Sequence, residues 1–332
     1  MPSEGPHGGA IDRMRRLFPA AQTPWIDLST GINPWPYRVA ETDPAMFDQL
    51  PTQSEYNACR NAMAKAIGAP RDSICLAPGS ELLIRLLPQF ISPKRVVILT
   101  PTYGDHLDVW RKAPCRVIET DTPLAQIDQS DAVIVCNPNN PNGQIFQPER
   151  LREAHAKLAE KSGWLIIDEA YADLSPDLSL ARQGGEDGLI ILRSFGKFYG
   201  LAGLRLGALV APPWLLARMT EQLGVWPVSS GALKIGAEAY ADRAWQESTR
   251  TTLKHMRRLL DEVLSAHKLE IVGGTDLFCL VCVEHAPEIW RGLAEAGIYV
   301  RRFDSLPEHL RIGLPKGENQ LARLNEALSL LA

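Results

Sequence analysis

The sequence lacks several features that define large classes of protein. None of its apolar runs approaches the roughly 20 residues that a membrane-spanning helix requires. Its start lacks the apolar core and small residues of a signal peptide, so we expect a cytoplasmic protein. The 35 Lys and Arg residues are balanced by 39 Asp and Glu residues, which leaves a formal net charge of -4 and favours neither a nucleic acid nor a membrane surface as partner. The expected partner is therefore a small molecule.

Cysteine is also scarce, with six in 332 residues. Cys75, Cys136 and Cys279 lie inside apolar runs, which is typical of small buried side chains and not of a disulfide framework. Cys279 and Cys282 form a C-x-x-C pattern, but a zinc site usually needs a second pair of ligands. The sequence therefore favours a buried strand at this position over a metal or redox site, and we predict no metal.

Short apolar runs alternate with helical stretches between about residues 74 and 210. The predicted strands are residues 74–76, 96–99, 132–135, 165–167, 189–192 and 208–210, and the helices between them are residues 81–90 and 148–161. Most runs are apolar throughout, as expected for a mainly parallel sheet with helices on both faces. The predicted fold class is α/β, with a doubly wound sheet in a large domain.

The pattern changes after residue 212 to helical segments at 214–223 and 232–267, followed by strands at 278–283 and 298–300. We interpret this part as a smaller α/β domain. A short helix is predicted at residues 11–18, within an N-terminal arm. The predicted organisation is an arm over residues 1–40, a large domain over 41–212 and a small C-terminal domain over 213–332.

Polar residues follow the predicted strands of the large domain. Because ligands bind outside the carboxyl ends of the strands of a doubly wound sheet, these segments are the candidate site. They are residues 78–81, 101–103, 137–143, 168–171 and 194–197.

Two of these segments suit a charged ligand. Gly79 and Ser80 open a helical pattern, where free backbone amides favour a phosphate, although an ordinary capped helix explains the same residues. Asp168 ends an apolar strand, and a buried carboxylate needs a cation. A protonated pyridine nitrogen would serve, and capping of the next helix is the alternative.

Lys197 follows a strand in a glycine-rich stretch, with Ser194 before it and Arg205 after it. An exposed lysine is usually only solvated, whereas a lysine at the edge of the sheet can form an imine with a carbonyl group. In that case Ser194 and Arg205 would add donors to a phosphate held at Gly79 and Ser80.

Three motifs together resemble the fold-type I, class I/II aminotransferases. They are Asn-Pro-Asn-Asn-Pro-Asn-Gly at residues 137–143, Asp-Glu-Ala-Tyr at 168–171 and Ser-Phe-Gly-Lys-Phe-Tyr-Gly-Leu-Ala-Gly-Leu-Arg-Leu-Gly at 194–207. Their order and spacing fit that family over about residues 25–315. The resemblance implies pyridoxal 5'-phosphate as cofactor, a large domain with a smaller one, and a homodimer.

The resemblance also implies a role for each site residue. Lys197 would be the Schiff-base lysine and proton shuttle, and Asp168 would pair with the pyridine nitrogen. Tyr171 and Asn140 would bond the phenolic oxygen of the ring, and Tyr103 would stack on its face. The phosphate contacts would come from Gly79, Ser80, Ser194 and Arg205, and Glu81 is counted with the cofactor-binding residues.

The N-terminal segment narrows the resemblance. His7-Gly8-Gly9 and the stretch over residues 25–34 resemble the branch of this family that decarboxylates L-threonine O-3-phosphate in cobalamin biosynthesis. The implied product is (R)-1-amino-2-propanol O-2-phosphate. Arg311 would bind the substrate carboxylate as a bidentate fork. The further substrate-binding residues would be His7, Gly31, Asn33 and Arg301.

Other readings stay open. Arg301, Arg302 and His7 are also explained as solvated charges and a terminal tail. The core motifs suit a histidinol-phosphate-type aminotransferase equally well, and a ligand-binding module without activity is a further alternative. A nicotinamide enzyme is disfavoured because no G-x-G-x-x-G follows a strand. Many relatives have Tyr-Pro where this chain has Leu50-Pro51, and Tyr56 is a candidate to replace that contact with the partner subunit.

Overall fold

The computed structural model describes residues 8–39 and 44–331, so that His7 lies outside the described residues. The chain divides into two compact units. The large unit consists of residues 36–140 and 144–246, and the small unit consists of residues up to Trp35, residues 141–143 and residues from Glu247 onward. The predicted domain ranges stay predictions. The compact units differ from them by grouping residues 213–246 with the large unit and the arm with the small unit.

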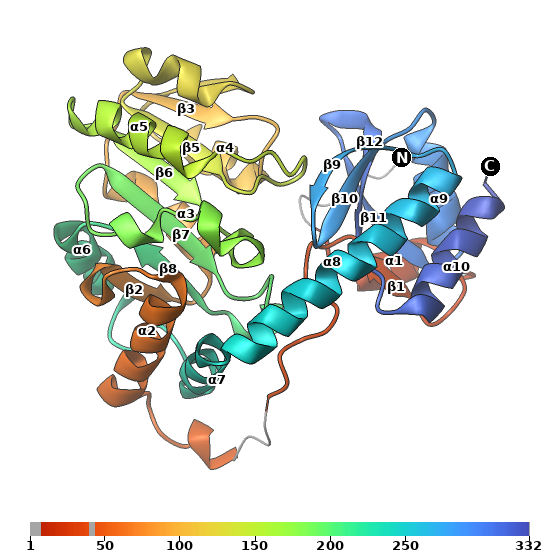
Figure 1. Cartoon of the computed structure of the whole chain (residues 1–332), viewed down its shortest axis with the longest axis horizontal. Coiled ribbons are helices and arrows are strands. Elements are labelled where there is room, and N and C mark those ends of the chain that lie inside the picture. The colour runs from red at the N-terminus through yellow and green to blue at the C-terminus, as the bar shows by residue number, and fades with distance from the viewer. Residues whose placement is uncertain (1–7, 40–43, 332) are drawn as a thin grey trace. The chain divides into compact units, whose positions relative to one another are not determined.

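A seven-stranded sheet forms the centre of the large unit (Figure 1). The strands are β2 (Ile74–Ala77), β3 (Arg95–Leu99), β4 (Arg116–Thr120), β5 (Ala132–Cys136), β6 (Trp164–Asp168), β7 (Leu189–Ser194) and β8 (Gly207–Val210). Their order is β2-β8-β7-β6-β5-β3-β4. Strand β8 is antiparallel to both of its neighbours, and the remaining pairs are parallel. The predicted mainly parallel α/β fold is confirmed.

Helices surround this sheet (Figure 1). They are α2 (Gln53–Ile67), α3 (Ser80–Leu86), α4 (Gly104–Trp110), α5 (Pro148–Ala159), α6 (Pro213–Leu223) and α7 (Ser230–Ala241). Fully buried Leu83 of α3 and Leu215 of α6 belong to the same core cluster as Ile166 and Ile190 of the sheet. This cluster explains why the central strands are apolar throughout.

Two predicted helices have different bounds. The helix predicted at residues 81–90 ends at Leu86, because Pro88 cannot donate to an α-helical turn and the chain continues as a 3-10 helix. The helix predicted at residues 232–267 is divided into α7 and α8 (Arg243–Ala266). The break lies at Asp242, whose Oδ1 accepts a hydrogen bond from the Trp245 amide at 2.9 Å.

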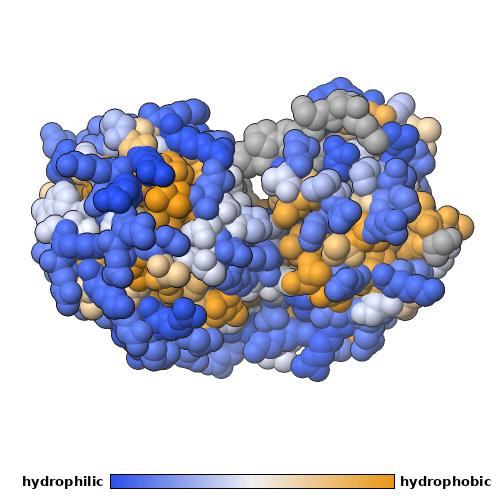
Figure 2. Space-filling view, turned by 90° about the horizontal axis from the view of Figure 1, so that it is seen from above, coloured by the Kyte–Doolittle hydropathy of each residue, from blue (hydrophilic) through white to orange (hydrophobic). Residues whose placement is uncertain are grey.

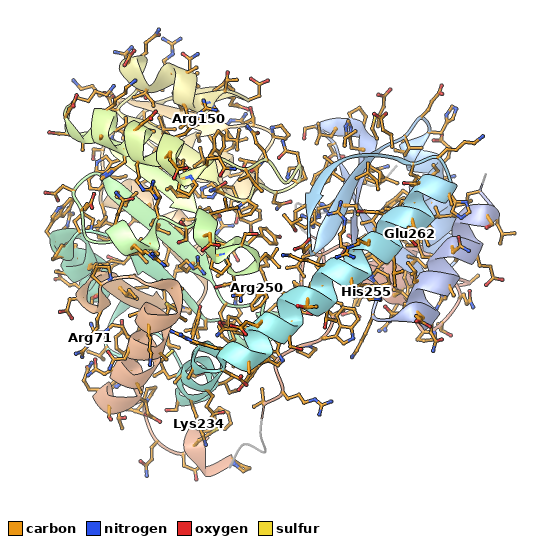
Figure 3. The ribbon with its side chains drawn as sticks, in the orientation of Figure 1. Arg71, Arg150, Lys234, Arg250, His255 and Glu262 are labelled. Carbon is orange, nitrogen blue, oxygen red and sulfur yellow. The ribbon has the colours of Figure 1, made fainter. Side chains whose placement is uncertain are left out.

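Helix α8 begins in the large unit and continues in the small unit. Figure 3 labels Arg250, His255 and Glu262 along it. Short 3-10 helices join other elements, at Pro44–Phe47, Arg71–Ser73, Leu87–Gln89, Pro123–Gln129, Ala172–Leu174, Pro176–Leu178, Ala181–Gln183 and Ala202–Leu204.

A five-stranded sheet of order β1-β11-β12-β10-β9 forms the small unit. Its strands are β1 (Ile26–Leu28), β9 (Glu270–Thr275), β10 (Phe278–Cys282), β11 (Ile298–Phe303) and β12 (Leu306–Gly313), and its other helices are α1 (Ile11–Leu17), α9 (Ala286–Glu295) and α10 (Glu318–Ser329). Strand β1 pairs in parallel with β11, so the arm contributes an edge strand to a sheet made mostly of C-terminal residues.

The loop residues 141–143 pack against β9 within the small unit. The Gly274 amide donates to the Asn142 carbonyl at 3.0 Å. Gly143 has φ +70, and a Cβ atom there would lie 1.8 Å from the Gly274 carbonyl oxygen. This close approach of two backbones requires glycine at position 143.

Three observations on the described residues concern membrane spans, cysteines and metal ligands. No helix among them is long and apolar enough to cross a membrane. All six cysteines are free, and Cys279 and Cys282 lie on β10, as expected for a buried strand. Within the described part of the chain, no three His, Cys, Asp or Glu residues are grouped so that they could hold a metal ion.

Candidate functional site

The predicted cofactor residues of the large unit meet at one edge of its sheet. Strands β3, β5, β6 and β7 are parallel neighbours, so their carboxyl ends lie side by side. Tyr103 follows β3, Asn140 follows β5, and Asp168 ends β6. Ser194 ends β7, and Lys197 lies three residues further on. Sequence positions up to 94 residues apart, from Tyr103 to Lys197, are thereby brought to the same edge.

Asp168 is buried at this edge, with 3% of its surface exposed. Its Oδ1 accepts a hydrogen bond from the Ala170 amide at 3.0 Å, and its Oδ2 lies 3.0 Å from Nε2 of His106. His106 is itself buried on α4, with 1% exposed. The sequence reasoning missed His106. The available signal was its position three residues after Tyr103, in a segment that follows a strand end.

The thiol of Cys136 lies at the same edge of the sheet. Cys136 ends β5 and is the register partner of Asp168. Burial raises the pKa of this thiol well above its usual value and the charge of Asp168 raises it further, whereas the backbone amide of Asn140 and the charge of Lys197 lower it. Asn140 and Lys197 follow the ends of β5 and β7, the two strands that flank β6 and its Asp168 along this edge.

Lys197 is half-buried and is held between aromatic residues. Phe195 and Tyr199 stack with their ring centroids 4.3 Å apart, and Tyr199 stacks on Trp245 at 5.6 Å. Phe198 meets both Tyr199 and Trp245 edge to face. These rings are fixed by close packing, so the backbone that carries Lys197 is rigid.

The start of α3 forms a cradle for an anion. Gly79 has φ +89, and a Cβ atom there would lie 2.7 Å from Nη2 of Arg205. A Cβ atom at Gly207 would lie 2.6 Å from the Ser80 amide nitrogen. The two glycines thus bring the amides at the start of α3 and the Arg205 guanidinium close together. Backbone amides with a guanidinium are a donor set that suits a phosphate.

The side chain of Glu81 faces the cations beside this cradle. Its Oε2 lies 3.8 Å from Nη2 of Arg205, and its Oε1 lies 3.2 Å from Nη2 of Arg85. A carboxylate repels a phosphate, so only the backbone amide of Glu81 is suited to bind one.

The ring of Tyr103 stands at the same edge. Its hydroxyl donates to Oδ2 of Asp105 at 3.1 Å, and its ring meets His106 edge to face at 6.3 Å. Burial and the charge of Asp105 raise the pKa of Tyr103, so the phenol keeps its proton.

Buried side chains fix the loop that precedes Asn140. The Asn137 amide group exchanges two hydrogen bonds with the backbone of Phe146, at 3.1 and 2.9 Å. Nδ2 of Asn139 donates to the Pro101 carbonyl at 2.8 Å, and Thr102 donates to its Oδ1 at 2.9 Å. The loops after β3 and β5 are therefore tied together at the site.

A buried ion network joins the ends of β6 and β7 beneath Tyr171. Arg193 donates to Glu169 at 2.9 Å and to Asp173 at 2.5 Å. Arg193 and Glu169 are 2% and 1% exposed. Glu169 also accepts from Ser179 and from the Leu180 amide. The network flanks Asp168 on one strand and Ser194 on the other, and so helps to set their positions.

The small unit brings together the predicted substrate arginines. Arg301 on β11 and Arg311 on β12 are register partners. They are 8% and 6% exposed, and both guanidinium groups lie over the ring of Phe303. Arg302 lies instead over the ring of Trp290, at 5.2 Å. Two buried cations on one sheet suit a ligand with two negative groups.

The loop after β1 lies beside Arg311. Nη2 of Arg311 donates to the Ser29 carbonyl at 2.6 Å, and the Gly9 amide donates to the Ser29 hydroxyl at 2.8 Å. Asn33 is 2% exposed and its Oδ1 accepts from the Trp35 amide. Gly31 is buried in the same loop. Gly9 therefore contacts Ser29, whose carbonyl oxygen also accepts the hydrogen bond from Arg311.

Tyr56 packs between α2 and β2. Its hydroxyl accepts a hydrogen bond from the Leu76 amide at 2.8 Å and lies 3.9 Å from Sγ of Cys75. A contact from Tyr56 to the partner subunit stays a prediction.

The chain is similar to known proteins both in sequence and in structure. The family model "Aminotransferase class I and II" matches residues 24–328. A threonine-phosphate decarboxylase of Pseudomonas aeruginosa is 37% identical over 97% of this chain and 96% of its own length. One of a Sinorhizobium species is 36% identical over 97% of each chain. The histidinol-phosphate aminotransferase of Sinorhizobium meliloti, solved in complex with pyridoxal 5'-phosphate, superposes with a TM-score of 0.78 at 20% identity, over 100% of this chain and 96% of its own.

Proposed function

Because this chain belongs to the aminotransferase class I and II family, we propose that it is a pyridoxal 5'-phosphate enzyme that decarboxylates L-threonine O-3-phosphate. The product is (R)-1-amino-2-propanol O-2-phosphate, for cobalamin biosynthesis. The observation that carries the proposal is 37% identity to a threonine-phosphate decarboxylase over nearly the whole of both chains. A cytoplasmic location accords with a chain whose described residues include no membrane-spanning helix.

The residues of the large unit fit the cofactor. The absence of a side chain at Gly79 and Gly207 lets the Arg205 guanidinium and the Ser80 amide approach closely, and these donors suit the phosphate. Asp168 is a buried carboxylate that can hold a proton on the pyridine nitrogen. Lys197 is the amine that binds the aldehyde. When bound, pyridoxal phosphate supplies a cationic ring that withdraws electrons from a bond at the α-carbon of the substrate.

The other residues of this unit orient the ring and move protons. Tyr103 covers the face of the ring, and Asn140 and Tyr171 donate to its phenolic oxygen. Ser194 and the Glu81 amide add donors to the phosphate. After carbon dioxide leaves, Lys197 delivers a proton to the α-carbon. The positions of Asn140, Asp168 and Lys197 at the carboxyl ends of neighbouring parallel strands support these roles.

The small unit supplies the substrate contacts. Arg311 takes the α-carboxylate, and Arg301 takes the substrate phosphate, with Gly31 and Asn33 lining the loop beside them. The burial of both arginines and their pairing on adjacent strands support this assignment. His7, which lies outside the described residues, is kept as a further proposed phosphate contact because of the sequence resemblance alone.

The choice between decarboxylation and transamination depends on which bond of the substrate stands perpendicular to the ring. Decarboxylation requires the carboxylate out of the ring plane, and transamination requires the α-hydrogen there. A histidinol-phosphate-type aminotransferase is the second candidate, because the structure of such an enzyme has the same fold. A ligand-binding module without activity would bind the cofactor and release no product.

One assay separates these functions. The purified protein is given threonine phosphate, histidinol phosphate or phosphoserine, each with and without 2-oxoglutarate. We expect carbon dioxide and aminopropanol phosphate from threonine phosphate without any keto acid. Glutamate formed only when 2-oxoglutarate is present would instead establish the aminotransferase.

We also propose a homodimer. Large apolar side chains of the large unit are exposed in the single chain, namely Phe47 at 65%, Leu50 at 61%, Val225 at 78% and Trp226 at 55%. The ring of Phe47 lies 3.0 Å from where a Cβ atom of Gly231 would stand, so the two exposed segments are neighbours. Figure 2 shows a different face, seen from above the view of Figure 1, on which hydrophobic residues also stand among mainly hydrophilic ones. A second copy of the chain is the partner that would cover these side chains.

A further inference from the structure

A connected series of charged side chains runs beside α3, from the anion cradle to Tyr103. Arg205 faces Glu81 at 3.8 Å, and Glu81 pairs with Arg85 at 3.2 Å. Nη2 of Arg85 also lies 3.2 Å from Oδ2 of Asp105. The same oxygen accepts the hydroxyl of Tyr103 at 3.1 Å. The series therefore ends at Arg205 and at Tyr103, which are proposed to contact the phosphate and the ring face of the cofactor.

Asp105 is the buried member of this series. Its side chain is 3% exposed, whereas that of Arg85 is 45% exposed. A buried carboxylate is stable only with a cation and hydrogen-bond donors close by. Arg85 supplies the charge from the solvent side, and Tyr103 supplies a hydroxyl from the site. Asp105 thus links an exposed arginine to a ring inside the site.

We propose that Asp105 is a positioning residue that holds the ring of Tyr103 against the cofactor, and that Arg85 holds Asp105 in its buried place through their ion pair. The inference rests on the proposed function, which puts Tyr103 on the cofactor ring and Arg205 on its phosphate. Because the Tyr103 side chain is fixed both at its Cα atom and at its hydroxyl, its ring adopts a single orientation. His106 meets this ring edge to face and lies 3.0 Å from Asp168, the proposed partner of the pyridine nitrogen. It therefore fixes the orientation of the Tyr103 ring relative to Asp168.

The formal charges of the series sum to zero before an anion enters the cradle. Two carboxylates, Glu81 and Asp105, alternate with two guanidinium groups, Arg85 and Arg205. A phosphate that engages Arg205 leaves Arg85 to neutralise both carboxylates. Loss of Arg85 therefore exposes the phosphate to unbalanced negative charge, an effect that grows as the ionic strength falls.

The first test asks whether Asp105 acts through the hydroxyl of Tyr103. The dissociation constant of pyridoxal 5'-phosphate is measured by absorbance titration for Tyr103→Phe, Asp105→Ala and the double variant. Each single change should weaken binding about threefold to tenfold, the range for one hydrogen bond. The double variant should be no weaker than the weaker single variant. If the two losses multiply, Asp105 does not act through Tyr103.

The second test asks whether Arg85 acts by neutralising Asp105. Pyridoxal, which has no phosphate, is the probe, so the effect of Glu81 on the cradle is left out. Arg85→Met should weaken pyridoxal binding, and adding Asp105→Asn should restore it, because asparagine keeps an acceptor for Tyr103 without a charge. An unrestored double variant would overturn the role of Arg85. Arg152→Met, in the exposed pair with Glu149, is the matched control and should bind as the wild type does.

Failure of this inference is distinct from failure of the proposed function. If the wild type binds no pyridoxal 5'-phosphate, the proposed function is wrong. If the wild type binds it and shifts its absorption into the visible range, but the Tyr103 and Asp105 changes multiply, only the positioning role is wrong. Thermal unfolding of each variant identifies any loss that comes from misfolding.

Discussion

At the scale of single residues, the contact between His106 and Asp168 is the interaction on which the cofactor site depends most directly. Both side chains are buried, and the distance from Nε2 to Oδ2 is 3.0 Å. A hydrogen bond to a buried carboxylate contributes about 1.5–3 kcal/mol, more than one between neutral groups. His106 therefore holds Asp168 in the orientation that its role requires.

Replacement of His106 by Leu tests this contact. We expect kcat for threonine phosphate to fall by about tenfold or more at saturating cofactor, because Asp168 loses its buried partner. The visible absorption of bound cofactor should remain in His106→Leu and be lost in Lys197→Ala. Steady-state kinetics and absorption spectra provide the measurement. An unchanged kcat would show that the role of Asp168 does not depend on its contact with His106.

The residues of the site differ in how far the sequence could predict them. Asp168 ends an apolar strand and Lys197 lies three residues after the end of one, so the strand-end rule selects both. His106 lies inside the short helix α4, where no periodic pattern distinguished it from a solvated histidine. The bond between the Tyr56 hydroxyl and the Leu76 amide could not be predicted, because it is a tertiary contact over 20 positions.

At the scale of elements, the fully buried strands could be predicted from the sequence, whereas the partly exposed strands could not. Strands β5, β6 and β7 are buried along nearly their whole length and were predicted from uniform apolar runs. Strands β4 and β9 are partly exposed edge strands with mixed sequences, and they were missed. Helix α2 was also missed, although Thr52 and Glu55 form a capping box at its start.

Gly143 offers a test of an element contact. Replacement by Ala should destabilise the protein by about 2–4 kcal/mol, since φ is +70 and the new Cβ would overlap the Gly274 carbonyl of β9. Gly203→Ala is the matched control, because no atom lies within 4 Å of its Cβ position. Urea unfolding of both variants gives the comparison. Equal stability of the two variants would show that the close contact between residue 143 and the Gly274 carbonyl does not require glycine.

At the scale of the whole molecule, the proposed association of two copies rests on the exposed side chains near residues 47 and 226. Trp226→Glu should shift the protein from dimer to monomer in size-exclusion chromatography with light scattering, because a carboxylate would be desolvated at the interface. Leu330→Glu, at an exposed site in the small unit, should leave the dimer intact. A monomeric wild type at micromolar concentration would contradict the proposal.

The family was predictable because its motifs lie in ordered positions along the whole chain, and the match over residues 24–328 confirms it. The branch was predicted from the N-terminal segment, and the relatives at 36% and 37% identity bear the same name as that branch. The two compact units were harder to predict, because residues 141–143 leave the large unit to join the small one. No local pattern in the sequence marks such a crossing.

The sheet of the small unit takes its strand β1 from residues 26–28 and its other strands from residues beyond 269. During synthesis on the ribosome, the large unit has all its residues once position 246 has emerged. Strand β1 is made about 270 residues before its partner β11. The nascent segment of β1 must therefore wait for the synthesis of residues 298–303 before it can pair.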